Sequence, residues 1–453
     1  MRRGAIRRRV DPVFHSTPDY GVLLVALYKQ THAISDFAEF IDSGRPLTAR
    51  LSENGIPAYE VGHIEQGKFK PTDILVNPNS DRILKRHDIL TGRVGGLGCF
   101  AEYKKNTPAS FSDNTLRIRP KTSQKSRAAF IEAFLNSTIG NTQLLRDSRG
   151  GLQKVVTQKS LGSVIVPSIG ASESRLVAEL DAARAERARA LAEAERLPLQ
   201  LEADIYRLLG IVIPPPDERK VYGIRLSSTR NSRLDAGYHH PRYIEAIRVL
   251  QAGNGQKIVL GDILRDIAGG ATPRAKDKSL YTNSGVKFLR ILNVKPNRFD
   301  FSDLNYIHEF VHEGMLKRSK LASNDVLMTI TGRVGTAAVV SDDDLPANIN
   351  QHIVRLRITT QRCLPKYLAA YLNTSLGGLL SNRSVSGGTR VALDYGAIRQ
   401  IPLLLPKLDI QHKVVELVDT EINEEARLRT HAEAVWREAR ERFEQQLLQG
   451  NKS

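Results

Sequence analysis

Cysteine is nearly absent from this chain of 453 residues, which contains only Cys99 and Cys363. The two lie far apart in the sequence, and neither has a second cysteine or a histidine at a metal-ligand spacing. The sequence therefore indicates neither a disulfide framework nor a zinc site. A reducing compartment suits such a chain, and we expect a cytoplasmic protein.

Long hydrophobic runs are missing as well. No stretch approaches the roughly 20 apolar residues that a membrane span requires. The first nine residues carry five arginines, but the apolar run at 22–27 is too short and too late for a secretory signal. We therefore expect a soluble protein without a membrane partner.

Motifs for catalysis are lacking too. The loop Asn77-Pro78-Asn79-Ser80 has neither the second proline nor the aromatic residue of amino-methylating enzymes, and no phosphate-cradling loop is present. The segment 216–220 resembles a nuclease signature only superficially, because its two carboxylates are adjacent in a proline-stiffened linker. His239-His240 has no companion carboxylate at a ligand spacing. The sequence predicts neither a catalytic nor a metal site.

Acidic residues are too few to balance the basic ones. The chain has 66 Lys and Arg against 49 Asp and Glu, a formal net charge of +17. Such an excess indicates a polyanionic partner, and nucleic acid before a membrane surface.

What the sequence does contain is an internal repeat. Residues Thr91-Gly92-Arg93-Val94-Gly95 return as Thr331-Gly332-Arg333-Val334-Gly335, 331 − 91 = 240 positions later. Further matches follow at offsets that drift from 224 to 240: Arg9, Asp11 and His15 with Arg233, Asp235 and His239; Leu116-Arg117-Ile118 with Leu356-Arg357-Ile358; Gly150-Gly151 with Gly387-Gly388; and Glu179-Leu180 with Glu416-Leu417. A duplication with a few loop insertions produces this pattern, so the chain is two copies of one unit.

The same order of elements is predicted in both copies. After a basic arm at 1–15, the first copy has helical spacing at 34–41, strands at 56–64, 88–91 and 115–118, a helix at 127–135 and a closing strand at 161–166. The second copy has strands at 286–294, 325–331 and 353–358, a short helix at 367–372 and a closing segment at 401–406.

A long helix is predicted after each copy. Residues 172–196 consist almost entirely of Ala, Glu, Arg and Leu. Pro198 should end or kink this helix, and a second short helix should run to Gly210. The other helix covers 409–449, and its apolar positions step mostly by four or seven, which is typical of an interhelical seam rather than a broad core face.

The predicted fold class is α+β, with two pseudo-repeated mixed α/β domains separated by two long helices that pack as an antiparallel coiled coil. We expect the first domain with its basic arm at 1–170, the first spacer helix region at 171–212, the linker and second domain at 213–408, and the second spacer helix at 409–453. The candidate seam and partner-binding residues are Leu176, Leu180, Leu191, Val414, Val418, Ile422, Val435 and Phe443.

The repeated pentapeptide supplies the candidate DNA-binding residues. Glycine lets a backbone come close to a ligand, and a guanidinium can fork onto a phosphate or onto guanine. A glycine-rich hairpin that only turns the chain is the alternative, but repetition in a basic protein favours binding. The candidates are Thr91, Gly92, Arg93, Thr331, Gly332, Arg333, Asn350 and Gln351, with further polar groups at Asn348, His352, Asp113 and Asn114.

The second copy closely resembles the target recognition domain of type I restriction-modification specificity subunits. The motifs that carry the resemblance are Gly270-Ala271-Thr272-Pro273, Asp325 to Gly332, Asn350-Gln351, and Pro406-Lys407-Leu408 with Gln411 at the start of the long helix. The first copy departs from them: Ser43-Gly44-Arg45-Pro46 lacks the Thr-Pro pair, three residues are missing before Thr91, and 167–174 lacks the glutamine.

The resemblance implies a non-catalytic subunit that reads a bipartite DNA target, one half-site per domain, with the helices setting the gap. It also implies two adenine methyltransferase subunits as partners, joined for restriction by ATP-dependent motor-nuclease subunits. S-adenosylmethionine, ATP and magnesium would then belong to the partners, and this chain would hold no cofactor.

Two other functions compete with this one. A related anti-phage or modification assembly could use the same two-unit scaffold mainly to bind proteins, and it would bind DNA weakly and without sequence preference. A stand-alone nuclease would need a carboxylate cluster that the sequence does not show.

Overall fold

The computed structural model describes residues 18–47, 55–77, 82–95, 98–146, 155–215, 221–229, 237–274, 277–383 and 392–450. The predicted basic arm, the double glycines and the nuclease-like segment at 216–220 lie outside these residues.

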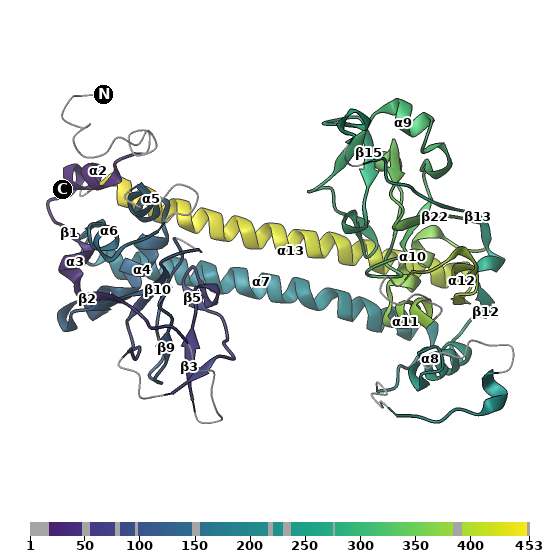
Figure 1. Cartoon of the computed structure of the whole chain (residues 1–453), viewed down its shortest axis with the longest axis horizontal. Coiled ribbons are helices and arrows are strands. Elements are labelled where there is room, and N and C mark those ends of the chain that lie inside the picture. Colours follow the sequence, from purple (N-terminus) through teal and green to yellow (C-terminus); the bar gives the residue numbers. More distant parts are fainter. Residues whose placement is uncertain are drawn as a thin grey trace. The chain divides into compact units, whose positions relative to one another are not determined.

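The chain folds into two compact units, and the two long helices are divided between them. Unit 1 comprises residues 1–191 and 429–453, and unit 2 comprises residues 192–428. Helix α7 (Ser172–Leu209) and helix α13 (Leu408–Gln449) thus contribute a part to each unit (Figure 1). Each unit has its own large hydrophobic core.

In addition to parts of the long helices, unit 1 contains α2 (Tyr20–Leu27), β1 (Thr31–Ala33), α3 (Ile34–Phe37), β2 (Ala38–Ser43), β3 (Ile56–Tyr59), β4 (Ile64–Glu65), β5 (Lys68–Phe69), β6 (Leu75–Val76), β7 (Ile89–Gly92), β8 (Phe100–Glu102), β9 (Ser110–Phe111), β10 (Thr115–Pro120), α4 (Ala128–Asn136), α5 (Thr138–Arg146), α6 (Gln158–Gly162) and β11 (Ile165–Pro167).

Unit 2 contains α8 (Pro241–Ala252), β12 (Gln256–Val259), β13 (Leu264–Gly269), β14 (Tyr281–Thr282), β15 (Val286–Leu289), β16 (Val294–Lys295), β17 (Arg298–Phe299), β18 (Asn305–Ile307), α9 (Glu309–Glu313), β19 (Val326–Thr329), β20 (Ala337–Val339), β21 (Ala347–Ile349), β22 (Ile353–Ile358), α10 (Pro365–Asn373), α11 (Ser375–Arg383), α12 (Tyr395–Arg399) and β23 (Pro402–Leu405).

The two units share one topology, which confirms the duplication. The central sheet has the strand order β2-β10-β7-β8 in unit 1 and β13-β22-β19-β20 in unit 2, antiparallel throughout. A smaller sheet beside it contains the parallel pair β3 and β9 in unit 1 and the parallel pair β15 and β21 in unit 2. The helix after the central sheet, α4 or α10, packs on it in both units.

Two arginines on β10 hold the central sheet of unit 1 together. The Arg117 guanidinium is only 2% exposed and donates from Nε and Nη2 to the two carboxylate oxygens of Asp42 on β2, at 2.9 and 2.6 Å. Arg119 donates in the same way to Asp88, at 2.8 and 2.6 Å, in the turn before β7. Both arginines also donate to the carbonyl of Ile83. One strand therefore fixes an edge strand and a turn through forked ion pairs.

Unit 2 repeats this arrangement with its own residues. Arg355 on β22 pairs with Asp266 on β13, and Arg357 pairs with Asp325 at 2.7 Å. Both arginines also donate to the carbonyl of Lys320. The equivalent arginines thus lie 355 − 117 = 238 positions apart.

We predict that Asp42→Ala destabilises unit 1 by about 3 kcal/mol, because the buried Arg117 guanidinium loses both of its forked hydrogen bonds and keeps only the Asp88 carboxylate, at 3.8 Å. Asp266→Ala is the matched control, and its cost is expected to be smaller because the Asp266 side chain is 49% exposed. Hydrogen exchange of peptides from β10 and β22 would measure both effects. If both variants lost the same amount of protection from hydrogen exchange, burial of the carboxylate would not determine the cost.

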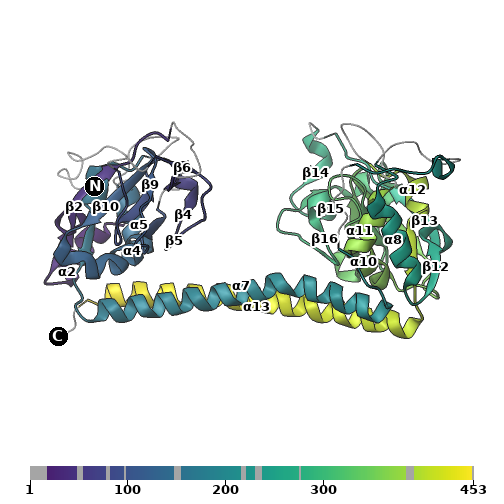
Figure 2. The same cartoon turned by 90° about the horizontal axis from the view of Figure 1, so that it is seen from below.

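Antiparallel packing of α7 against α13 is found within each unit, as predicted. In unit 1 the beginning of α7, with Leu176 and Leu180, shares a core with the end of α13, with Phe443 and Leu447. In unit 2 the end of α7 shares a core with the beginning of α13 (Figure 2). However, these cores also contain the sheet and its helices, so the apolar positions form a core face as well as a seam. The prediction of a seam alone was wrong.

Pro198 was predicted to end or kink the first long helix, and it does not end it, so the predicted second short helix is part of the first. Helix α7 continues through this proline to Leu209. A proline inside a helix removes one backbone hydrogen bond and costs ~3 kcal/mol. The last turns of α7 offset this cost, because Ile205 and Leu209 are completely or almost completely buried in the core of unit 2.

Two shorter predictions also fail. The helical spacing at 34–41 holds only over Ile34–Phe37, after which the chain continues as strand β2. Of the closing strand predicted at 161–166, residues 161 and 162 are the end of helix α6, and strand β11 begins only at Ile165. In both places the β-branched and aromatic residues of a short segment fit a helix or a strand equally well, and packing decides between them.

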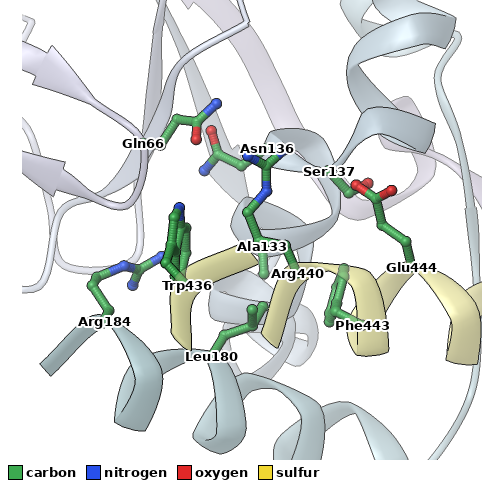
Figure 3. A pocket seen from close by; sticks show the side chains of 10 residues that line it. All are labelled: Gln66, Ala133, Asn136, Ser137, Leu180, Arg184, Trp436, Arg440, Phe443 and Glu444. Atoms are coloured by element: carbon green, nitrogen blue, oxygen red, sulfur yellow. The ribbon is translucent and has the colours of Figure 1, made fainter. Parts of the chain in front are cut away.

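A small pocket in unit 1 lies where the globular part meets the two helices. It is lined by Gln66, Ala133, Asn136, Ser137, Leu180, Arg184, Trp436, Arg440, Phe443 and Glu444 (Figure 3). Its free volume is about 20 Å³, enough for a single water molecule. The Arg184 guanidinium lies over the Trp436 ring, 5.5 Å from its centroid.

Next to this pocket, Glu132 is a buried carboxyl group. Its partners are the Asn136 amide and, at 3.9 Å, the Arg184 guanidinium. Burial raises the pKa of Glu132 from 4.5 to about 7, although the positive charge of Arg184 acts in the opposite direction. Between these two pH values the folded state keeps a proton that the unfolded state has released.

We therefore predict that unit 1 loses stability as the pH rises from 4.5 to about 7, by a contribution of about 3 kcal/mol. Glu132→Gln should remove this pH dependence and make unit 1 more stable above pH 7. Urea unfolding followed by the fluorescence of Trp436, the single tryptophan, would report it. A pH dependence that persists unchanged in the variant would rule out Glu132 as its source.

Candidate nucleic-acid interface

Three of the sequence motifs of unit 2 meet where strand β19 ends and strand β22 begins. We call this end of the central sheet its edge. Strand β19 ends at Thr329, which is paired with Ile353 at the start of β22. The loop after β19 and the turn before β22 are therefore neighbours. The first contains Thr331, Gly332 and Arg333, and the second contains Asn350 and Gln351.

The third motif joins them through a glycine. A Cβ atom on Gly270 would lie 2.0 Å from the carbonyl oxygen of Ile349 and 2.5 Å from that of Asn350. Only glycine allows so close an approach. It brings Thr272 next to the turn, where the Thr272 hydroxyl hydrogen-bonds to the Gln351 side-chain oxygen.

A chain of hydrogen bonds continues from Gln351 across the edge. The Gln351 amide nitrogen donates to Nε2 of His352 at 3.2 Å, and Nδ1 of His352 then donates to the Thr331 hydroxyl at 2.9 Å. Four side chains from three motifs are thus linked into one network. Such a network fixes the orientation of the exposed Gln351 amide before any ligand binds.

The loop after β19 is fixed by its backbone. Gly332 and Gly335 have φ angles of +66° and +93°, which favour glycine. The Thr329 hydroxyl hydrogen-bonds to the carbonyl of Arg333, and the Arg333 residue is exposed. This leaves its guanidinium accessible for a phosphate or a guanine edge.

Asn350 has an internal role instead. It is only 7% exposed, and its side-chain oxygen accepts a hydrogen bond from the His352 backbone at 3.1 Å. Asn348 is completely buried and bonds to Ser319 and His312. Of the amides predicted in this unit, Gln351 alone is both exposed and part of the edge.

The two copies of the pentapeptide do not occupy equivalent positions, and this corrects the alignment made from the sequence. In unit 1 the backbone of Arg93 donates to Asn114 and accepts from Val156. In unit 2 the residue with these two bonds is Ile330, which donates to His352 and accepts from Leu393. The structural offset is therefore 330 − 93 = 237, three less than the offset of the identical residues.

The glycines with positive φ agree with this register. Gly95 and Gly98 have φ angles of +68° and +82°, and they correspond to Gly332 and Gly335. By the same count, the partner of Arg333 is position 96, which lies outside the described residues. Strand pairing and glycine conformation therefore define which residues are equivalent, and the two identical pentapeptides are out of this register by three residues. This shift explains why three residues seemed to be missing before Thr91.

The shift changes the position of the unit 1 candidates. Thr91 and Gly92 are buried in strand β7 and do not reach the surface. Arg93 is exposed just beyond the strand. Asp113 and Asn114 form the turn before β10, and the Asp113 backbone donates to the carbonyl of Arg45.

Gly44 plays the part of Gly270 in unit 1. A Cβ atom on Gly44 would lie 2.0 Å from the carbonyl oxygen of Phe111. The segment that follows, Arg45-Pro46, takes the place of Ala271-Thr272. Unit 1 therefore presents Arg93, Asp113 and Asn114 where unit 2 presents a hydroxyl, an amide and an imidazole. Thr272 belongs to one of the sequence motifs and His352 was among the further polar groups, but only the structure links them to Gln351.

The candidate residues of the long helices are mostly inside the cores. Leu176, Leu180, Val414, Val418 and Phe443 are at most 5% exposed. Leu191, Ile422 and Val435 are half-buried. These side chains join the helices to the globular parts, and a separate partner would have to contact other residues of the helices.

Within the described part of the chain, no group of three or more His, Cys, Asp and Glu is placed to hold a metal ion. No helix among these residues is long and apolar enough to cross a membrane.

Comparison with known proteins identifies the domain that carries this edge. Residues 255–433 match the family model of the type I restriction modification DNA specificity domain. The matched residues lie almost entirely in unit 2. The resemblance inferred from the sequence motifs is thereby confirmed, and the edge that joins Gly270, Thr331 and Gln351 lies within the matched residues.

One related protein matches part of the chain, and one solved structure shares its fold. The EcoBI specificity subunit of Escherichia coli is 24% identical over 135 residues, which is 30% of this chain and 28% of that protein's length. A solved structure from a study of complex assembly and conformational transition in a type I restriction-modification system covers 92% of this chain and 96% of its own, at 17% identity and a TM-score of 0.53. This likeness shows a shared fold over both units.

Two further solved structures align over 93% of the chain. They are the HsdS subunit of Thermoanaerobacter tengcongensis, at 15% identity and a TM-score of 0.40, and the S subunit of M. genitalium, at 11% and 0.46.

We predict that His352→Ala loosens the edge of the specificity domain, because it breaks the link between Gln351 and Thr331. Amide exchange in the loop from Thr331 to Gly335 should rise, and DNA binding should weaken about tenfold, or ~1.4 kcal/mol. His412→Ala, at an exposed site on α13, is the control. Unchanged exchange in the loop would show that the network does not order it.

Proposed function

We propose that this chain is the DNA specificity subunit of a type I restriction-modification complex. It reads a bipartite DNA sequence, with one half-site for each unit, and it directs adenine methylation and restriction by partner subunits. The observation that carries the proposal is that the same sheet edge is built twice, on equivalent strands and glycines, but with different side chains.

The physical features of the chain support this function. A net charge of +17 favours a polyanion, and residues 255–433 match the family model of the DNA specificity domain. Two equivalent edges with different exposed groups suit a target whose halves differ in sequence. The long helices that are shared by the two units would set the gap between the half-sites.

Chemistry belongs to other subunits in this proposal. Two methyltransferase subunits supply S-adenosylmethionine and the methyl transfer, and motor-nuclease subunits supply ATP hydrolysis, magnesium and cleavage. This chain contributes sequence recognition and is not itself catalytic.

The experiment that tests the proposal is to co-express this chain with the methyltransferase encoded beside it and to map methylated adenines across the genome. A bipartite motif with a fixed gap is expected, and it should disappear when this chain is omitted. If a stable complex forms without any such motif, the chain is a protein-binding scaffold rather than a specificity subunit.

We predict that Arg93→Ala and Arg333→Ala each relax recognition of a different half-site, by about 1–3 kcal/mol at the bases concerned. Both side chains are exposed beside the sheet edge of their own unit. Methylation mapping with each variant would measure the change, and Arg189→Ala, on an arginine that is 76% exposed on α7, is the control. A uniform loss on all sequences would make these arginines phosphate contacts instead.

A further inference from the structure

Four exposed cations gather at the other end of strand β7 in unit 1. Lys85 and Arg86 lie in the turn before β7, and Lys104 and Lys105 lie in the loop after β8. The two segments are neighbours, because the backbone of His87 donates to the carbonyl of Tyr103 at 2.9 Å. We call Lys85, Arg86, Lys104 and Lys105 the cationic patch.

Few carboxylates neutralise the cationic patch. Lys104 lies 3.7 Å from Asp181 on α7, and both side chains are about half-exposed. Lys85, Arg86 and Lys105 have no ion pair with any carboxylate in the part of the chain that the structure describes. Four like charges on adjacent strand ends, which lie about 5 Å apart, repel one another unless an anion lies between them.

The fold itself does not require these cations, as unit 2 demonstrates. The turn before β19 has the same hydrogen bonds, with Asp325 in the place of Asp88 and a positive φ at Asn324 in the place of His87. However, the residues that correspond to Lys85 and Arg86 are Ala322 and Ser323.

The equivalent loop of unit 2 carries the opposite charge. After β20 the chain continues as Ser341, Asp342, Asp343 and Asp344, where unit 1 has Lys104 and Lys105 after β8. One structural position is therefore strongly cationic in unit 1 and anionic in unit 2. A difference of this size in equal backbones indicates a ligand for unit 1 alone.

We propose that the cationic patch is a second DNA contact, which binds the phosphate backbone beside the half-site of unit 1 and has no counterpart in unit 2. This inference rests on the proposed function, because it assumes that DNA lies against the Arg93 edge. Strand β7 separates the patch from that edge by its four residues, or roughly 13 Å. A single duplex can contact both, since one helical turn is ~34 Å long.

Phosphates are the ligand that the patch fits best. Duplex DNA carries one negative charge per ~1.7 Å of axis, so several cations can each meet a phosphate without any base contact. Such contacts position the protein and are independent of sequence. The acidic loop of unit 2 would repel the backbone at the equivalent place, so the contact is one-sided.

The test compares the full chain, in complex with its methyltransferase, with a variant in which the patch is neutral. This variant carries Lys85→Ala, Arg86→Ser, Lys104→Ser and Lys105→Ser. The control removes the same charge from four arginines that are 64–79% exposed, with Arg189→Gln, Arg196→Gln, Arg248→Gln and Arg427→Gln.

The expected result is that the patch variant binds target and unrelated duplexes at least tenfold more weakly at low salt. The slope of log K against log salt should become shallower by about 2–4, since each lost phosphate contact contributes ~0.9. Hydroxyl-radical footprints should lose protection only beside the half-site that Arg93→Ala relaxes. The methylated motif itself should stay the same.

Other outcomes would overturn the proposal. If patch and control variants weaken binding equally, only the net charge matters. If DNA binding is unchanged but the complex with the methyltransferase dissociates, the patch contacts an acidic protein surface. These results differ from a failure of the proposed function, in which even the unmodified complex would methylate no defined motif.

Discussion

Ion pairs between the arginines of a central strand and the carboxylates of its neighbours are the constraint on which both units depend. Arg117 in unit 1 and Arg355 in unit 2 lie on the strand that pairs with two others, β10 with β2 and β7, and β22 with β13 and β19. Each arginine also binds a carboxylate of the edge strand, β2 or β13. A buried guanidinium is tolerated only when it is paired and hydrogen-bonded. Because these pairs hold the turn before β7 or β19 as well, they position everything that the sheet carries at its ends.

The two ends of the sheet have diverged to different degrees. At the end with the glycine-rich loop, both units keep the backbone conformation and change the side chains, as Arg93 and Ile330 illustrate. At the opposite end, the turn before β7 in unit 1 is cationic, whereas the equivalent turn before β19 in unit 2 is neutral. After the duplication the two units have thus kept the same sheet, while the side chains at the ends of its strands have changed. This pattern is expected of a scaffold that carries recognition loops.

Much of the architecture could be predicted from the sequence, because the duplication and the helical composition are visible as patterns. The details that failed have physical reasons. The five identical residues at 91–95 and 331–335 were aligned with each other, although strand pairing shows that the equivalent positions differ by three residues. The helix was predicted to end or kink at Pro198 because a proline destabilises a helix locally, but the burial of Ile205 and Leu209 offsets this cost. Thr272 and Gln351 lie 79 positions apart in the sequence, and no spacing rule indicates a contact between them. Only the structure shows that Thr272 is linked through Gln351 to the adjacent His352.

The division of the long helices has a consequence for synthesis on the ribosome. Unit 2 is one continuous stretch, residues 192–428, so all of its parts have been made before the chain is finished. Unit 1 is discontinuous, and its core includes Ala439, Phe443 and Leu447 from the last turns of α13. The domain that is translated first is therefore completed last, and a premature stop late in the message would damage the N-terminal domain while leaving the C-terminal one intact.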